Sequence, residues 1–282
     1  MDGIILIDKP SGWTSHDVCK KISRVLDKAK VGHSGTLDPF ATGLLIVAIN
    51  KATKALLYAN FSYKTYVATL KLGTKTKTGD LTSEVEKEAP IPTLNKEDIE
   101  KILKSFEGKS EQIPPMTSAK HFNGVKLYVY AQQGVEVERQ SQSIDIKYIK
   151  LLSYDEESIT FQCLVSSGTY IRVLGEDIAS KLGTVGYLTS LRRIAFGEKE
   201  EITVDQACTI EDINTSKIYP IINFIDLPHV EVDEITKRNA IFGQNLKIKS
   251  KEKKVLLVNN NEAIAIYEKV DIDTYHCERG LW

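Results

Sequence analysis

The sequence lacks the features that mark membrane-spanning, exported and disulfide-rich proteins. Its 282 residues contain no apolar run of the roughly 18 residues that a membrane-spanning helix needs. Residues 1–10 (MDGIILIDKP) have neither the basic start nor the apolar stretch of a secretory signal. Only four cysteines occur, and none belongs to a CxxC pair, which argues against a disulfide scaffold and a zinc knuckle. We therefore expect a protein of the reducing cytoplasm.

Motifs for several common chemistries are also missing. There is no G-x-x-x-x-G-K-[ST] phosphate loop and no G-x-S-x-G nucleophile elbow. The five histidines include no H-x-x-x-H pair that would suit a metal ion. His33, Ser34 and Asp38 lie within six residues of one another, which is too close for the three members of a hydrolase triad to line up. We expect neither a metal nor a cofactor.

A strong excess of positive charge, the usual sign of a nucleic-acid-binding protein, is missing as well. The formal net charge is −1. The charge is unevenly distributed, however, because residues 1–80 carry 12 Lys and Arg against 6 Asp and Glu, whereas residues 201–245 carry 3 against 8. A near-neutral total can therefore conceal a basic face that binds nucleic acid. Ordinary solvated surface is the alternative explanation, and charge counts do not decide between them.

The segment Val31–Leu45 is the most informative stretch of the chain. It contains three glycines, one proline and a single carboxylate, Asp38, and it leads directly into the apolar run Gly43–Ile49, which is typical of a buried strand. Because Pro39 restricts the residue before it, Asp38 is expected on a stiff loop with its side chain held in one direction. Asp38 is then either a turn cap or a catalytic carboxylate, which would need a cationic partner to stay ionised in a dry pocket.

Apolar periodicity predicts a mixed α+β domain. Helices with apolar residues at helical spacing alternate with strand-like runs, and Lys64–Gly73 continues into an exposed polar hairpin or loop at residues 74–80 whose hydroxyl and ammonium groups suit phosphate contacts. The expected strands are residues 3–8, 43–49, 64–73, several within 137–166 and 185–197, and the expected helices are about 15–26, 95–106 and 168–182.

The last part of the chain differs from the rest. From about His229 the pattern changes to short strands with polar turns, which suits a small β-barrel appended to the main domain. We therefore predict two domains, residues 1–226 and residues 227–282.

Five short motifs occur in order along the chain. They are residues 7–10 (IDKP) with 14–18 (TSHDV), 32–39 (GHSGTLDP) with 41–43 (ATG), 64–66 (KTY), 168–172 (GTYIR) and 191–193 (LRR). Each motif alone would be weak, but together and in this order they are highly specific, and they resemble the motifs of the TruB family of tRNA pseudouridine synthases.

The resemblance implies both a fold and an activity. The fold would be a mixed, mainly antiparallel sheet of pseudouridine synthase type with helices packed on it, and the C-terminal barrel would be a PUA-like RNA-binding domain. The activity would be isomerisation of the uridine at position 55, in the T-loop of tRNA, to pseudouridine. Asp38 matches the family's essential aspartate, and two roles stay open for it: attack on C1′ of the sugar, or removal of a proton from C2′.

The resemblance also assigns roles to other residues. Arg172 would pair with Asp38 through a bidentate fork. Tyr66 would stack on the target uracil and take part in catalysis, Tyr170 would line the pocket, and Leu191 would form its apolar wall. His33 would contact RNA and help to hold the target nucleotide outside the stack of bases. The remaining substrate-binding residues would be Lys9 and Pro10.

The chain departs from the family pattern at three places. Ser34 stands where a threonine is usual, Thr117 where a tyrosine is usual, and Gln132 where an arginine is usual. These changes are expected to affect RNA binding more than the catalytic step. We expect an insertion at residues 114–135 to contact the T-arm and to be mobile without RNA.

Two other functions use the same surface. One is a non-catalytic protein that binds or folds tRNA, and the other is an rRNA pseudouridine synthase guided by a separate RNA. A carboxylate paired with Arg172 favours catalysis, because phosphate binding does not require one. The expected partner is the T-arm of tRNA, with no membrane involved, and the expected state is a monomer.

Overall fold

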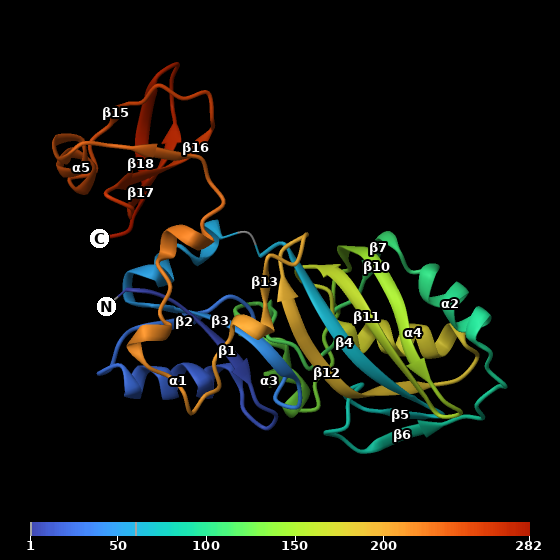
Figure 1. Ribbon diagram of the computed structural model, residues 1–282. Helices are drawn as coiled ribbons and strands as arrows, with labels where there is room; N and C mark the ends of the chain where they lie inside the picture. The colour runs from blue at the N-terminus through green and yellow to red at the C-terminus, as the bar shows by residue number, and fades with distance from the viewer. Residues whose placement is uncertain (1, 60) are drawn as a thin grey trace.

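Two β-sheets organise the chain, as Figure 1 shows. The computed structural model describes residues 2–59 and 61–282. A nine-stranded sheet is built from residues 3–203, and a five-stranded sheet from residues 229–280. The predicted domain boundary at residues 226 and 227 falls between them, and we keep it as a proposal. No helix in the described part of the chain is both long enough and apolar enough to span a membrane.

The large sheet is mixed and mainly antiparallel, as predicted. Its only parallel ladder in the described residues joins β3 to β12. The path runs through β1 (Gly3–Lys9), β3 (Thr42–Ile49), β12 (Gly186–Phe196), β4 (Tyr63–Leu72), β11 (Ser158–Ser166), β10 (Gln142–Tyr154) and β7 (Gly108–Gln112), with β2 (Val31–His33) on β3 and β13 (Ile202–Thr203) on β12.

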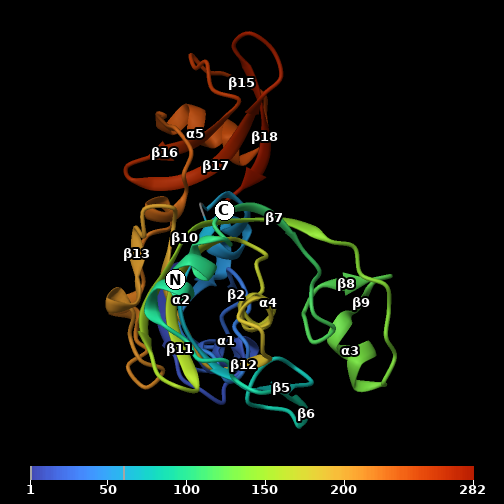
Figure 2. The ribbon, with the colours of Figure 1, turned by 90° about the vertical axis from the view of Figure 1, so that its right-hand side faces the viewer.

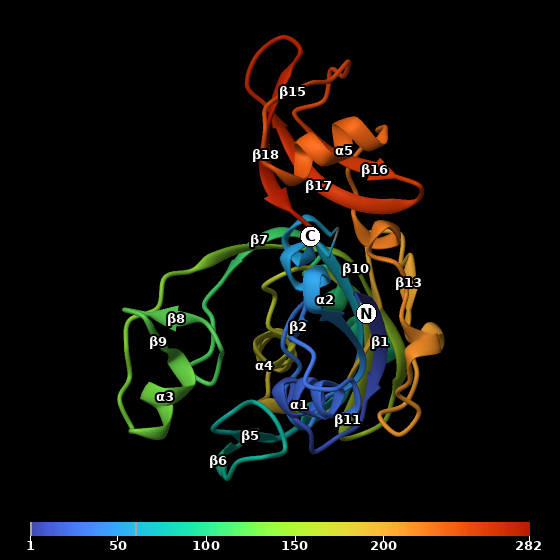
Figure 3. The ribbon, with the colours of Figure 1, turned by 90° about the vertical axis from the view of Figure 1, so that its left-hand side faces the viewer.

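Three helices pack on this sheet, and their ends follow from local chemistry. The helix α1 (Ser15–Val25) begins with a capping box between Thr14 and Asp17. Asn95 caps α2 (Lys96–Lys104), where its side chain accepts a hydrogen bond from the Asp98 N–H. The third helix is α4 (Ile171–Lys181). Figures 2 and 3 show α1 and α4 on the same side of the sheet.

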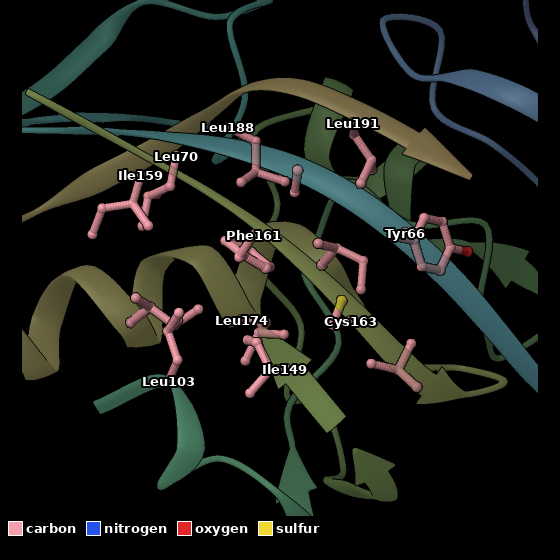
Figure 4. Packing of buried hydrophobic residues seen from close by; sticks show 14 of the residues in the cluster. Tyr66, Leu70, Leu103, Ile149, Ile159, Phe161, Cys163, Leu174, Leu188 and Leu191 are labelled. Carbon is pink, nitrogen blue, oxygen red and sulfur yellow. The ribbon is translucent and has the colours of Figure 1, made fainter. Parts of the chain in front are cut away.

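The main core lies between the sheet and α2 and α4. Buried side chains of β4, β11 and β12 meet Ile99 and Leu103 of α2 and Leu174 and Ile178 of α4. Figure 4 shows Tyr66 and Leu191 at one end of this cluster, beside its fully apolar members. A second cluster joins α1 to β1 and β3. The core therefore runs directly up to residues that the sequence analysis assigned to a site.

Short elements connect these parts. The described 3-10 helices are η1 (Asn50–Lys54), η2 (Leu56–Tyr58), η3 (Val204–Gln206), η4 (Thr215–Lys217) and η5 (Ile221–Phe224). The predicted hairpin forms between β5 (Thr74–Thr76) and β6 (Val85–Glu88). The prediction of an exposed loop at residues 74–80 is wrong at three positions, because Thr76, Gly79 and Asp80 are buried.

The insertion forms a small lobe of its own. It contains β8 (His121–Phe122), β9 (Val125–Lys126) and α3 (Leu127–Gln132). Figures 2 and 3 show this lobe standing away from the large sheet. At its base, the Arg139 Nη1 donates to the Pro114 carbonyl at 3.2 Å, which ties the outgoing and returning segments together.

The C-terminal sheet has five strands in an open path. Its order is β14 (His229–Glu231), β16 (Lys254–Asn259), β17 (Glu262–Lys269), β18 (Thr274–Gly280) and β15 (Leu246–Lys247). No ladder in residues 2–59 and 61–282 joins the two edges, so the strands form an open sheet and not a closed barrel. The helix α5 (Glu234–Ile241), capped by Asp233, was not predicted, because its apolar residues do not form a single buried stripe.

The parallel junction between β3 and β12 depends on one glycine. Gly43 has φ of +98° and lies opposite Arg193 in the ladder. A Cβ at this position would lie 2.2 Å from the backbone oxygen of Arg193. Only glycine avoids both the backbone strain and this contact.

We predict that Gly43→Ala lowers the free energy of unfolding by about 3 kcal/mol or more, because backbone strain and a backbone clash add. Gly183→Ala is the matched control, since its φ is +83° but no heavy atom lies within 4 Å of the added Cβ. We expect the control to lose about 1 kcal/mol in urea unfolding. Equal losses in the two variants would show that the close approach of β12 is unimportant.

Candidate active site

The loop that carries Asp38 is held from below by the start of α1. Ser15 Oγ accepts a hydrogen bond from the Leu37 N–H at 2.9 Å and lies 3.3 Å from the Leu37 carbonyl oxygen. The Gly12 N–H donates to the Pro39 carbonyl at 2.8 Å. The stiff loop predicted from glycine and proline therefore has a second cause, which is direct bonding to residues 12–15.

Lys9 belongs to the same support. It is fully buried at the end of β1, and its Nζ donates to the carbonyl oxygens of Trp13 at 2.7 Å, Pro10 at 2.9 Å and Pro39 at 3.3 Å. Burial lowers the pKa of its ammonium group to about 8, against the opposing attraction of Asp38. Neither Lys9 nor Pro10 lines the pocket described below. The geometry makes Lys9 a support of the Asp38 loop, and the substrate contact expected from the sequence stays a prediction.

Asp38 and Arg172 form the ion pair expected from the sequence. The Arg172 Nε lies 2.9 Å from Oδ2 of Asp38, and Nη2 donates to Oδ1 at 3.3 Å. Burial raises the pKa of the Asp38 carboxyl group, and the neighbouring Asp80 raises it further, whereas Arg172 opposes both effects. The arginine is therefore the principal group that opposes this rise and favours the ionised form of the Asp38 carboxylate, whose side chain is 31% exposed.

The rest of the Arg172 guanidinium group binds two other segments. Its Nη1 donates to the Thr78 carbonyl at 2.8 Å and to Thr117 Oγ1 at 2.7 Å, and Nη2 donates to the Thr117 carbonyl at 2.9 Å. Nη1 also lies 3.5 Å from Oδ2 of Asp80. The side chain is 4% exposed, and its orientation is fixed on every side.

Sequence reasoning missed Asp80 and the contact of Thr117. Asp80 is 4% exposed, and its Oδ1 accepts from Thr78 Oγ1 at 2.8 Å and from the Thr82 N–H at 2.9 Å. The available signal was that Asp80 is the single carboxylate in the Lys- and Thr-rich residues 71–82. For Thr117 no local signal exists, because its partner is 55 residues away along the chain.

A pocket of about 240 Å³ opens beside this ion pair. It brings together five residues predicted from the sequence and leaves out three, namely His33, Lys9 and Pro10. The lining consists of Thr36, Leu37, Asp38, Lys64, Tyr66, Ser118, Ala119, Gly168, Thr169, Tyr170, Ile171, Arg172 and Leu191. Two of these residues, Ser118 and Ala119, belong to the insertion.

Aromatic and apolar side chains form the walls. Tyr66 on β4 is 7% exposed, and Leu191 on β12 is 5% exposed. Burial raises the pKa of the Tyr66 hydroxyl group, so the phenol is neutral at ordinary pH. Tyr170 precedes α4, and Gln112 fixes its backbone, since the Tyr170 N–H donates to Oε1 at 2.8 Å and Nε2 donates to the Tyr170 carbonyl at 3.2 Å.

His33 caps its own loop. Its Nδ1 accepts a hydrogen bond from the Gly35 N–H at 3.2 Å. Burial and the positive charge of Arg193 lower the pKa of the imidazole, which favours the neutral form. Since His33 does not line the pocket, the predicted contact with RNA would have to occur outside it.

Two further cations near the pocket were not assigned a role from the sequence. Arg193 on β12 is fully buried, and its Nε donates to the Leu44 carbonyl at 2.7 Å. Lys64 on β4 lines the pocket itself. In residues 2–59 and 61–282, no three His, Cys, Asp or Glu side chains are grouped so that they could hold a metal ion.

The arrangement can supply one kind of chemistry. A carboxylate kept ionised by a buried guanidinium group faces a small pocket with an aromatic wall. Such a group can attack an electrophilic carbon or accept a proton from carbon, while the walls exclude water and hold a flat ring.

The chain is similar to known proteins over most of its length. Residues 23–171, more than half of the chain, match the family model described as "TruB family pseudouridylate synthase (N terminal domain)". A tRNA pseudouridine synthase B of Hydrogenovibrio crunogenus is 43% identical over 217 residues, which cover 77% of this chain and 71% of the relative. A tRNA pseudouridine synthase B of Streptococcus thermophilus is 36% identical over 282 residues, which cover 95% of each chain.

Solved structures share the fold. A chain in the crystal structure of a Cbf5-Nop10-Gar1 complex superimposes with a TM-score of 0.74 at 25% identity, covering 99% of this chain and 85% of that one. The motifs, the sheet and the paired Asp38 and Arg172 agree with this similarity. The chain therefore belongs to the TruB family, and it is a tRNA pseudouridine synthase, an isomerase.

Proposed function

We propose that the enzyme isomerises uridine 55 in the T-loop of tRNA and that Asp38 is its essential catalytic residue. The observation that supports this proposal is the bidentate ion pair of Asp38 and Arg172 at a pocket lined by Tyr66, Tyr170 and Leu191. Binding of RNA phosphates does not require a carboxylate paired with an arginine, whereas cleavage at the sugar carbon does require a nucleophile or a base.

The reaction breaks the bond between N1 and C1′ and forms a bond between C5 and C1′. The uracil turns within the pocket between these steps, N1 gains a proton, and C5 loses one. Asp38 would either attack C1′ or take a proton from C2′, and both roles need the carboxylate form. Arg172 keeps that form and aims its oxygens through two parallel contacts.

The target base must leave the T-loop stack to reach Asp38. Extrusion of a nucleotide costs a few kcal/mol. Stacking on an aromatic ring such as Tyr66 returns about 1–3 kcal/mol for one base. The pocket of about 240 Å³ offers room for a small flat ring and no obvious room for a paired helix, which supports base flipping.

Three surfaces would hold the tRNA. The Lys- and Arg-rich residues 1–80 would supply salt-dependent phosphate contacts. The insertion at residues 114–135 would contact the T-arm. The C-terminal sheet would act as a PUA-like RNA-binding domain, and the enzyme would work as a monomer in the cytoplasm.

Tritium release tests the reaction directly. With T-arm RNA labelled with tritium at uracil C5, the protein is expected to release tritium, because C5 loses its hydrogen when it joins C1′. We predict that Asp38→Asn abolishes release while the RNA dissociation constant changes by less than about tenfold. Asp155→Asn, in the exposed turn between β10 and β11, is the matched control and should stay active. Turnover by Asp38→Asn would show that Asp38 is not essential to the mechanism. If the unmodified protein also released no tritium, the non-catalytic tRNA-binding protein would be favoured.

Asp80 is expected to influence how activity depends on pH, through its effect on the pKa of Asp38. Activity is lost as pH falls through the raised pKa of Asp38. Since the negative charge of Asp80 contributes to that raised pKa, we predict that Asp80→Asn moves the acid limb of kcat/KM to lower pH. It should also lower kcat by about a hundredfold, because Arg172 loses a partner that holds it in place. Glu84→Gln in the same hairpin is the control. An acid limb that stays in place or moves to higher pH would contradict the prediction.

The Thr117 hydroxyl group couples the insertion to Arg172. We predict that Thr117→Val lowers kcat by about tenfold, because the buried Nη1 loses its closest acceptor. Thr117→Ser should keep near-normal kcat, and single-turnover rates with saturating T-arm RNA measure both. Equal losses in the two variants would mean that the threonine methyl group matters and the hydroxyl bond does not.

A further inference from the structure

Lys64 is the one charged side chain of the pocket lining with no charged or hydrogen-bonding partner in residues 2–59 and 61–282. The other two charged lining groups, Asp38 and Arg172, bind each other. Lys64 lies two residues before Tyr66 on β4, so both side chains lie on the same face of the sheet. The ring of Phe196 lies 5.8 Å from Nζ, at the edge of the range for a cation–π contact, and it satisfies none of the three N–H donors.

A second cation lies next to Lys64. A Cβ added at Gly35 would be 3.1 Å from the Lys64 Nζ and 4.0 Å from Nη1 of Arg193, so both groups border the space beside this glycine. Arg193 is fully buried, its Nε and Nη2 have carbonyl acceptors, and its guanidinium group also interacts with the Tyr66 hydroxyl group. Within residues 2–59 and 61–282, no acceptor lies within 3.5 Å of its Nη1 in hydrogen-bonding geometry. Two positive charges therefore border the same space, and no ion pair in the described part of the chain neutralises either of them.

This arrangement costs free energy in the unliganded protein. Burial and the charge of Arg193 lower the pKa of Lys64 to about 7, which is the physical consequence of crowding two cations in a poorly solvated place. Natural sequences keep such a local conflict mainly at functional sites. An anion placed beside Gly35 would relieve it, and Asp38 cannot serve because both of its oxygens face Arg172.

The anion that RNA carries next to each sugar is the backbone phosphodiester. We propose that Lys64 binds a backbone phosphate of the target nucleotide on the Gly35 side of the pocket, and that this contact places the sugar against Asp38. Lys64 is then a positioning residue, and Arg193 adds long-range attraction from beneath it. The proposal rests on the proposed function, because it assumes that the nucleotide enters this pocket.

The first experiment measures RNA affinity without turnover. In the Asp38→Asn background, we compare Lys64→Met and Lys64→Arg, with Lys71→Met as the control on the same strand, where Lys71 pairs with Glu157. With a T-arm stem-loop, Lys64→Met is expected to weaken binding about tenfold and to reduce the slope of log K against log salt by about one. Lys64→Arg should bind like the background, and Lys71→Met should change neither quantity.

The second experiment identifies the phosphate. Each of the two phosphates flanking the target uridine is replaced in turn by a neutral methylphosphonate. The sugar on the 5′ side of the methylphosphonate is 2′-deoxy. The reference RNA has the same deoxy sugar and an ordinary phosphate. One replacement should weaken binding with Lys64 present and have no further effect in Lys64→Met. If the effects of both phosphate replacements on the binding free energy are additive with that of Lys64→Met, Lys64 contacts neither phosphate and the proposal is wrong. If Lys64→Met binds normally but shifts the basic limb of the rate profile, the lysine transfers a proton and the proposal is equally overturned.

Folding and the proposed function are checked separately. Thermal unfolding of Lys64→Met should match the parent, since the change removes an unpaired cation, and a large loss of stability would assign Lys64 a structural role. Tritium release by the enzyme with Asp38 intact tests the proposed function alone. Coupling between Lys64 and one phosphate without any tritium release would keep the anion site and reject the reaction, whereas release without coupling would do the opposite.

Discussion

The Arg172 guanidinium group is the contact on which the site depends. It brings together four segments that are far apart in the sequence: the Asp38 loop, the β5–β6 hairpin through Asp80, the insertion through Thr117, and its own helix α4. Each segment satisfies part of the same buried group, so none can move without leaving a donor or a charge unpaired. The position of the Asp38 carboxylate is thus fixed by electrostatics as much as by packing.

The balance of charges around this group has a chemical consequence. Arg172 is shared by two carboxylates, and burial and Asp80 both work against ionisation of Asp38, whereas Arg172 and Lys9 favour it. A carboxylate that is ionised but poorly stabilised is more basic and more nucleophilic than one in water. The same arginine therefore keeps the charge in place and, because it is shared with Asp80, does not neutralise it completely.

Much of the fold could be predicted because its causes are local. Capping by Thr14 and Asn95, the apolar run before Ile49 and the alternation after Lys64 each lie within one element. The exposed hairpin was wrong at Asp80 because burial there comes from Arg172, 92 positions later in the sequence. The helix α5 was missed because two of its apolar residues, Ile235 and Ile241, are exposed and give no clear periodicity.

Some residues of the site could be predicted from the sequence, and others could not. Asp38, Arg172 and Tyr66 could be named because their motifs resemble a family, and the structure brings them to one pocket. Their catalytic roles remain proposals. Lys9 was expected to contact substrate. In the structure its ammonium group donates to three carbonyl oxygens. The motif IDKP alone does not predict these contacts. Arg193 and Lys64 gained meaning only from the register of β4 against β12.

Thr117, one of the three departures from the family pattern expected from the sequence, contacts the arginine that binds Asp38. Thr117 lies in the insertion, directly before the pocket-lining Ser118, and its hydroxyl and carbonyl oxygens both accept hydrogen bonds from Arg172. A tyrosine at this position could not place a hydroxyl group at the same distance from its backbone, so its contact with the arginine would differ. The base of the insertion is therefore coupled to Asp38, because its displacement would change the hydrogen bonds of the Arg172 group that contacts Asp38.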